Sequence, residues 1–186
     1  IADMRARLPE MPAARAERLV AQYGLARDEA LSLSNDLDVA RYFEAKKIPA
    51  LFRVHEPPEK DKLRDFERLL QGLGIGHRKI TTPRALQDVL NSVKESNYEF
   101  IVNRVLLRSM KQARYFARNK GHYGLASDSY LHFTSPIRRY PDLVCHRILK
   151  GALAGKQPVY DEEELAVMAA HLSERERIVM EAEREL

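Results

Sequence analysis

The chain has 186 residues, of which 45% are hydrophobic and 31% charged, a composition typical of a globular protein with one domain or one domain and an appendage. The formal net charge of +4 is too small to indicate a polyanion partner by itself. The single cysteine, Cys145, excludes an internal disulfide and a zinc site built from cysteines. No apolar run approaches the roughly 20 residues that span a bilayer, and no signal-peptide pattern opens the chain. We therefore expect a cytoplasmic protein without membrane contact.

Residues 1–45 are predicted to form a helical N-terminal segment. Pro12 begins a run of good helix formers, and Gly24 suits the position just past its end. A second helix is expected to start near Asp36, whose side chain would cap it, and to end at Phe43 or Lys46.

Two strings in this segment carry a family resemblance. They are Met4-Arg-Ala-Arg-Leu-Pro-Glu-Met-Pro12 and Arg15-Ala-Glu-Arg-Leu-Val-Ala-Gln-Tyr-Gly-Leu25. Residues 1–44 thereby resemble the B subunit of aspartyl/glutamyl-tRNA amidotransferase, where its catalytic body joins its helical tRNA-binding tail. The amidotransferase chemistry lies outside this stretch, so the resemblance implies no catalytic residue here.

Residues 46–98 are predicted to contain one strand and two helices. The strand covers 48–55, which is rich in aliphatic and aromatic residues and is followed by two prolines. The first helix covers 59–71, has one apolar face, and ends at Gly72. The second begins at Thr82-Pro83, because a threonine cap and a first-turn proline are typical of a helix start.

A further helix is predicted from Tyr98 to Arg118. At about 100° per residue, four cations fall on one stripe opposite an apolar side: Arg104, Arg108, Lys111 and Arg118. Residues 101–150 hold ten cationic side chains and two carboxylates, a local balance of +8. Such an excess in a nearly neutral chain indicates a polyanion partner. A solvated charged face is the alternative.

The stretch 130–142 combines a strand-like alternation with a helix start. Residues 130–134 alternate in polarity, Pro136 ends the alternation, and Arg138 and Arg139 follow. Tyr140-Pro141-Asp142 then begins a helix that runs to residue 154. Two guanidinium groups beside free helix amides form a good phosphate site. The alternative is a surface turn whose arginines pair with carboxylates.

Three strings resemble the ribonuclease II/ribonuclease R family of 3′-to-5′ exoribonucleases. They are His132-Phe-Thr-Ser-Pro-Ile-Arg-Arg-Tyr-Pro-Asp-Leu143 with His146-Arg147 after it, His55-Glu-Pro-Pro58, and Leu106-Leu-Arg-Ser-Met-Lys-Gln-Ala113. The resemblance covers about residues 46–186 and implies the C-terminal half of the catalytic domain. The expected fold is α+β and predominantly helical, with a few short strands and a helical N-terminal extension over 1–45. Two unrelated resemblances indicate a fragment or a chimera, with its seam near 35–46.

The resemblance implies hydrolysis of single-stranded RNA from the 3′ end to nucleoside 5′-monophosphates, with magnesium as the cofactor. Arg138 would contact the scissile phosphate. Glu183, in the last predicted helix (162–186), would be the acid near the metal or the attacking water. Arg139, Tyr140 and His132 would support the 3′-terminal nucleotides.

The metal site is the departure from the family pattern. The family's aspartate cluster belongs to the earlier half of the domain, and the nearest carboxylates here are Asp36 and Asp38, which a helix cap explains. Magnesium needs several oxygen ligands held together, so no metal ligand is assigned. We expect the chain to bind RNA and to hydrolyse little or none. If active, it would be a magnesium-dependent exoribonuclease.

Two alternatives come from other classes of protein. One is a non-catalytic tRNA- or RNA-binding module, and the other is a folded chimera without function. Apolar surface left exposed by missing strands would favour self-association or a second chain.

Overall fold

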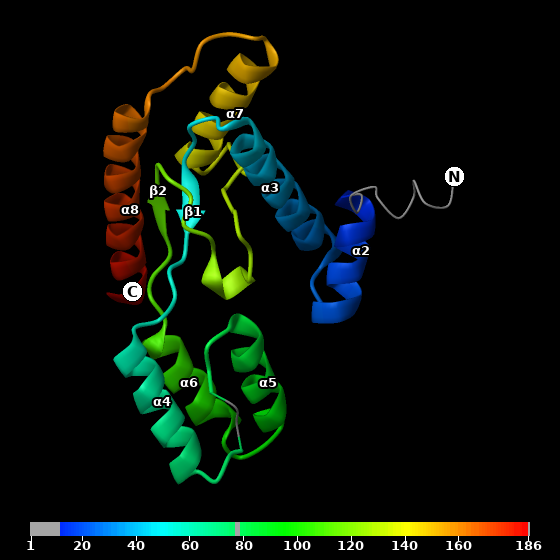
Figure 1. Cartoon of the computed structure of the whole chain (residues 1–186), viewed down its shortest axis with the longest axis vertical. Helices are drawn as coiled ribbons and strands as arrows, with labels where there is room; N and C mark the ends of the chain where they lie inside the picture. Colours follow the sequence, from blue (N-terminus) through cyan, green and yellow to red (C-terminus); the bar gives the residue numbers. More distant parts are fainter. Residues whose placement is uncertain (1–11, 77–78, 186) are drawn as a thin grey trace. The chain divides into compact units, whose positions relative to one another are not determined.

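The computed structural model describes residues 12–76 and 79–185, which fall into two compact units. Unit 1 consists of the described residues up to Phe52, then 115–119 and 129–185, and unit 2 consists of the described residues in 53–114 and 120–128. Figure 1 labels the helices and strands of both units. The predicted fold class is confirmed, because the chain is mostly helical with two short strands. No helix in the described ranges is both long and apolar enough to cross a membrane. The predicted division at residue 45 stays a prediction.

Unit 1 contains four helices among its described residues: α2 (Pro12–Tyr23), α3 (Arg27–Lys46), α7 (Tyr140–Leu153) and α8 (Glu162–Glu185). Strand β1 (Phe52–Val54) pairs with β2 (Arg114–Phe116) in a two-stranded sheet, of which Phe52, Tyr115 and Phe116 belong to unit 1. Phe52 also forms an antiparallel bridge with Leu131. Cys145 on α7 is buried, as expected, and burial raises the pKa of its thiol to about 12.

Helix α3 begins earlier than predicted. It starts at Arg27, with Asp28 and Glu29 in its first turn, where carboxylates stabilise the helix dipole. The N–H of Ala26 donates to Glu29 Oε2 at 3.2 Å. Since no proline or glycine interrupts residues 27–46, the predicted start at Asp36 was wrong, and Asp36 lies inside the helix.

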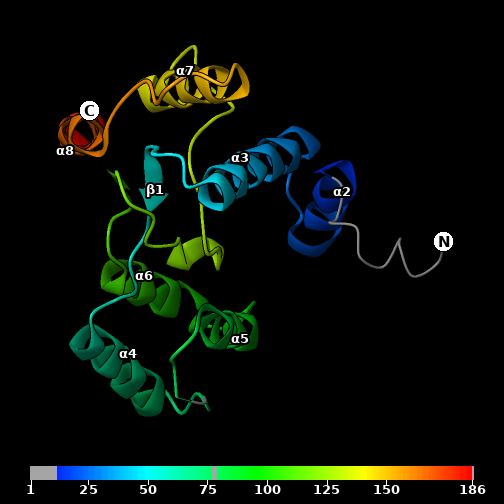
Figure 2. The ribbon, with the colours of Figure 1, turned by 45° about the horizontal axis from the view of Figure 1, so that its top comes forward.

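Helices α2 and α3 pack against each other, as both views show (Figure 1, Figure 2). Ala16, Leu19 and Ala30 form the apolar part of their contact. Beside it, the nearly buried Arg15 donates to Asp38 Oδ1 at 2.5 Å. Asp38 is therefore the ion-pair partner of Arg15 and not a helix cap.

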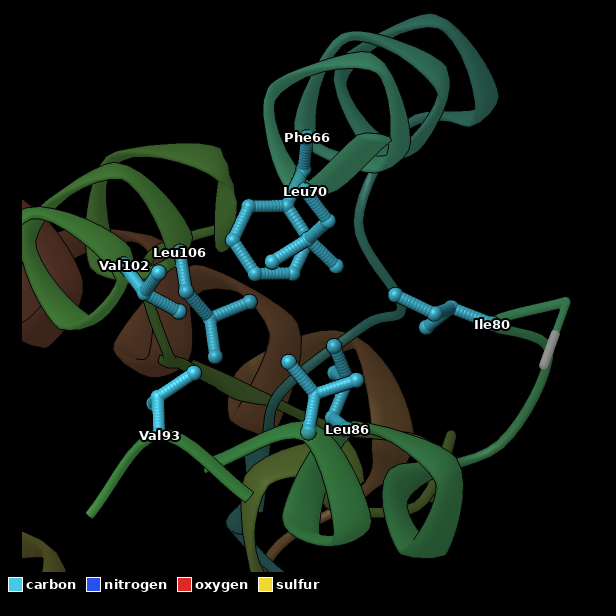
Figure 3. Close-up of a cluster of buried hydrophobic side chains, with 8 residues drawn as sticks. Phe66, Leu70, Ile80, Leu86, Val93, Val102 and Leu106 are labelled. Carbon is cyan, nitrogen blue, oxygen red and sulfur yellow. The ribbon is translucent and has the colours of Figure 1, made fainter. Parts of the chain in front are cut away.

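Unit 2 contains α4 (Lys60–Gly72), α5 (Pro83–Val93), α6 (Glu99–Ser109) and the 3₁₀ turn η1 (Tyr123–Leu125). Its three α-helices enclose an apolar cluster (Figure 3). The cluster consists of Phe66, Leu70, Ile80, Leu86, Val89, Val93, Val102 and Leu106. The predicted start of α5 is confirmed, because Thr82 Oγ1 accepts the N–H of Ala85 at 3.2 Å.

Two histidines hold the loop 120–128 in unit 2. The N–H of Gly124 donates to His55 Nδ1 at 3.0 Å, and the His55 and His122 rings meet edge to face at 5.1 Å. A Cβ on Gly124 would lie 2.8 Å from His55 Nδ1, so only glycine permits this approach. Burial is the main cause that lowers the pKa of both histidines, to about 4 for His122.

The helix predicted over Tyr98–Arg118 was wrong in its second half. Helix α6 ends at Ser109, Met110 is extended, and β2 follows. The cause is long-range, because β2 pairs with β1 and the Tyr115 N–H donates to Ser173 Oγ on α8 at 2.9 Å. The predicted stripe of four cations on one helix therefore does not exist.

Candidate nucleic-acid interface

The candidate interface of unit 1 is the corner formed by residues 132–142, just before and at the start of α7. The Ser135 carbonyl accepts the N–H groups of Arg138 at 3.2 Å and Arg139 at 3.0 Å, which closes a tight turn. Asp142, fully buried in the first turn of α7, accepts the Ser135 N–H at 2.7 Å. The carboxylate thus ties the helix start back to the turn.

The two adjacent arginines of the corner have different environments. Arg139 Nη2 donates to Asp142 Oδ1 at 2.7 Å, and its side chain is 22% exposed. Burial lowers the pKa of Arg139, but the hydrogen bond and the charge of Asp142 outweigh it, so the guanidinium stays charged. Arg138 is exposed and makes no side-chain hydrogen bond or ion pair within the described ranges. Arg138 is therefore the arginine available to a phosphate.

Asp36 holds the corner from α3. Its Oδ1 accepts the N–H groups of Phe133 and Thr134, both at 3.0 Å, and its Oδ2 accepts the Tyr130 hydroxyl at 3.1 Å. Asp36 is 2% exposed, and burial raises the pKa of its carboxyl more than these hydrogen bonds lower it. The sequence prediction treated Asp36 as a cap and missed this role. The signal was its spacing, because Asp36 shares a helix stripe with the buried Ala40 and Phe43.

Aromatic side chains support the same loop. Tyr115 Oη lies 2.9 Å from His132 Nδ1, so the predicted RNA contact His132 already has a protein partner. The rings of Phe133 and His146 stack at 3.9 Å, and His146 Nε2 donates to the Phe133 carbonyl at 2.9 Å. These contacts fix the backbone that leads into the arginine turn.

Tyr140, at the first position of α7, is 49% exposed. The guanidinium of Arg147 lies 6.0 Å from its ring centroid, and Arg147 Nη1 donates to the Tyr160 hydroxyl at 3.3 Å. The predicted support of the 3′-terminal nucleotides by Tyr140 stays a prediction.

Glu183 is exposed near the end of α8. In the part of the chain that the structure describes, no contact joins it to Arg138. Helix α8 reaches the corner indirectly, since Ser173 accepts from Tyr115, whose hydroxyl meets His132. Glu183 follows Ser173 by about 15 Å along the helix axis, at about 1.5 Å per residue. The predicted role of Glu183, as the acid near the metal or the attacking water, stays a prediction.

The other predicted cations divide between the units. Arg104 and Arg108 are exposed on α6, and Lys111 is exposed in the loop after it, all in unit 2. Arg118 follows β2 in unit 1 and pairs with Glu162 at the start of α8. The first three make no ion pair within the described ranges and remain available to phosphates.

The carboxylates of the described residues do not form a magnesium site. No group of three or more metal-ligating side chains lies together in these ranges. Asp36 has its oxygens on three hydrogen-bond donors, Asp38 is paired with Arg15, and Asp142 with Arg139. The residues present do not fit the metal that the family resemblance implies, so no step is derived through it.

Comparisons with known proteins show the family of this chain. The RNB domain matches residues 13–155, so the chain belongs to the RNB-domain family. The predicted resemblance to ribonuclease R is confirmed. "Ribonuclease R 1" of Lactococcus lactis is 38% identical over 178 residues, which are 92% of this chain and 21% of that protein.

Solved structures show the same similarity. Mycoplasma genitalium RNase R in complex with ribose-methylated single-stranded RNA matches with a TM-score of 0.77 and 29% identity, over 86% of this chain and 26% of that one. The same protein has been solved with double-stranded RNA. Yeast Ssd1, described as a pseudonuclease, matches with a TM-score of 0.72 and 27% identity, over 78% of this chain and 19% of that one. This chain spans about a fifth to a quarter of the length of its curated relatives.

The N-terminal segment is part of the same match. The RNB match begins at residue 13 and takes in most of the stretch in which we expected an amidotransferase resemblance. The string Met4–Pro12 lies almost entirely outside the described residues. Neither the amidotransferase resemblance nor a chimera is supported. The Ala/Arg/Glu/Leu composition of 13–23 suits many helices, which makes short matches there weak.

Proposed function

We propose that this chain is the RNA-binding part of a 3′-to-5′ exoribonuclease that releases nucleoside 5′-monophosphates from single-stranded RNA. One observation carries the proposal. Arg138 is exposed and has no ion-pair partner among the described residues, at a turn that Asp36 and Asp142 hold in place, while Arg139 is neutralised by Asp142. A solvated guanidinium carried by a fixed backbone turn beside a helix start suits a phosphodiester.

The remaining site residues take roles around this phosphate. Arg138 contacts the scissile phosphate and stabilises the charge that develops on it. Tyr140 stacks on a base, while Arg139 and His132 support the 3′-terminal nucleotides by holding the loop. Glu183 is the acid that would orient the attacking water in the complete enzyme.

The cations of unit 2, and Arg118 of unit 1, are further candidates for phosphate contacts. Arg104, Arg108 and Lys111 are exposed, and Arg118 would exchange Glu162 for a phosphate at little cost, because exposed ion pairs contribute little. We propose that these residues bind RNA without reading its sequence, as phosphate contacts do.

Catalysis by the complete protein requires magnesium ligands from outside these residues. Because Asp36, Asp38 and Asp142 are bound to arginines and backbone amides, we expect this chain by itself to bind RNA and to hydrolyse little of it. A non-catalytic RNA-binding module is the second candidate, and the same occupied carboxylates favour it. The similarity to the yeast pseudonuclease is consistent with that reading.

The test is a binding and cleavage assay with labelled single-stranded RNA and magnesium. Arg138→Ala should weaken binding about 10-fold, the effect of losing one charge-assisted phosphate contact. Arg64→Ala is the matched control, because Arg64 is an exposed arginine on α4 that pairs only with Asp61 among the described residues. Equal affinity of the Arg138→Ala variant and the unmodified chain would contradict the proposal. Mononucleotide release by this chain would show that its own residues complete a catalytic site.

A further inference from the structure

The outer face of α6 carries an exposed aromatic ring. The inner face packs into the apolar cluster, where Val102 and Leu106 point towards the side chains from α4 and α5 (Figure 3). On the opposite face, Phe100 is 72% exposed and Leu107 is 75% exposed. A phenylalanine open to solvent to this degree loses the stabilisation that burial would give it.

Cations follow this ring along α6 and just past its end. The Arg104 guanidinium lies 5.9 Å from the Phe100 ring centroid, and Arg108 follows one turn further along the same face. Lys111 continues the basic run just past the end of the helix. The one carboxylate in α6, Glu99, lies at its first position and accepts the Glu95 N–H at 2.7 Å. No anionic side chain therefore compensates the cations beside Phe100 within α6.

The exposed ring and the cations next to it favour some binding partners over others. An apolar protein surface seated here would desolvate three cations that make no ion pair within the described ranges, which is strongly unfavourable. A single-stranded nucleic acid offers phosphates to the cations and an unstacked base to the ring. A duplex offers only phosphates, because its bases are already stacked on one another.

We propose that Phe100, Arg104, Arg108 and Lys111 form a stacking platform that selects single-stranded over double-stranded RNA. Phe100 stacks on one base, Arg104 covers the edge of the stack, and Arg108 and Lys111 contact the flanking phosphates. This inference rests on the proposed function and adds a source of strand selectivity in unit 2.

The test measures the affinity of the full chain for a fluorescent single strand and for the duplex of the same sequence. Phe100→Ala should weaken single-strand binding by about 5- to 100-fold, the usual effect of losing one stacked base. Duplex affinity should stay within about twofold, because only phosphate contacts operate there. Phe100→Tyr keeps an aromatic ring and should retain the single-strand affinity. Leu107→Ala removes a similar apolar area without a ring and should leave both affinities unchanged.

The outcomes separate this inference from the proposed function. If Arg138→Ala weakens binding while Phe100→Ala does not, the platform is overturned and the proposed function stands. If the unmodified chain binds neither the single strand nor the duplex, the proposed function is contradicted, and the platform with it. If Phe100→Ala and Leu107→Ala both reduce self-association in sedimentation and neither changes single-strand affinity, the face is a protein contact and the platform is overturned.

Discussion

Arg138 and Arg139 are adjacent in the sequence, but only Arg139 is paired with a carboxylate. Adjacent residues in a turn point in different directions, so only one of two arginines can reach a given carboxylate. Asp142 lies three residues after Arg139 and takes its guanidinium, which leaves Arg138 to solvent. The sequence could predict two arginines at a helix start, but it could not predict that Asp142 would be fully buried.

Asp36 gives the first prediction at this scale. Asp36→Ala removes the acceptor of two backbone N–H groups and one hydroxyl, all far from it in the sequence. We expect it to lower the free energy of unfolding by about 2–5 kcal/mol, because each unsatisfied buried donor costs about 1–3 kcal/mol. Asp36→Asn should cost less, since it retains one carbonyl oxygen for the two amides. Urea unfolding followed by circular dichroism measures both.

The control for Asp36 is an exposed aspartate in a helix. Asp61→Ala breaks an exposed i,i+3 pair with Arg64 and should change stability by less than about 0.5 kcal/mol. If Asp36→Ala were no more destabilising than Asp61→Ala, Asp36 would not hold the corner.

His122 gives a prediction for pH dependence. Burial, then the neighbouring His55 and Arg53, lower its pKa from 6.5 to about 4 in the folded chain. The unfolded chain therefore binds more protons between these values, so stability is full above about pH 6.5 and falls as the pH drops towards about 4. After allowance for solvent screening of this partly buried ring, the loss should be on the order of 1–2 kcal/mol.

Urea unfolding at a series of pH values checks this slope. His122→Gln should remove much of the decrease between pH 6.5 and 4, the range set by the shifted pKa. His171→Gln, at an exposed position on α8, should leave it in place. A His122→Gln variant with an unchanged slope would mean that other groups cause the acid sensitivity.

At the scale of elements, the sequence predicted the bounds of those helices that are set by residues near their own ends. Thr82 and Pro83 start α5 as expected, and the bounds of α4, α7 and α8 lie close to those predicted. The two helix limits that were predicted wrongly involve residues with distant partners. Helix α6 ends at Ser109, and Tyr115, a few residues later, lies in strand β2 and donates its N–H to Ser173. Neither partner is visible in the periodicity of residues 98–118, which continues without a glycine or a proline.

The same reasoning applies to α3. Its interior aspartate looked like a cap because aspartate is a common first residue of helices. Its hydrogen-bond donors are Tyr130, Phe133 and Thr134. They come from the stretch 130–142, which also carries the two arginines. A single sequence shows both segments but not that they meet.

At the scale of the whole molecule, the cations available to RNA occur in both units. Within the described ranges, the predicted contacts without an ion pair are Arg138 in unit 1 and Arg104, Arg108 and Lys111 in unit 2. A net charge of +4 does not indicate such an excess, because most carboxylates lie elsewhere in the sequence. Polyanion binding should therefore follow the local charge and not the average.

This distribution predicts a steep salt dependence. If all four cations contact phosphates of a single strand, the logarithm of the association constant should fall against the logarithm of salt concentration with a slope of about −3, since each contact contributes about −0.7. Arg104→Ala with Arg108→Ala should reduce the slope to about −1.4. Arg64→Ala with Arg68→Ala, which removes two exposed α4 arginines paired with aspartates, should not change it. Fluorescence anisotropy across a salt series measures all three slopes. A slope near zero for the unmodified chain would contradict phosphate contacts in either unit. An unchanged slope in the Arg104/Arg108 variant would show that these two arginines make no phosphate contact.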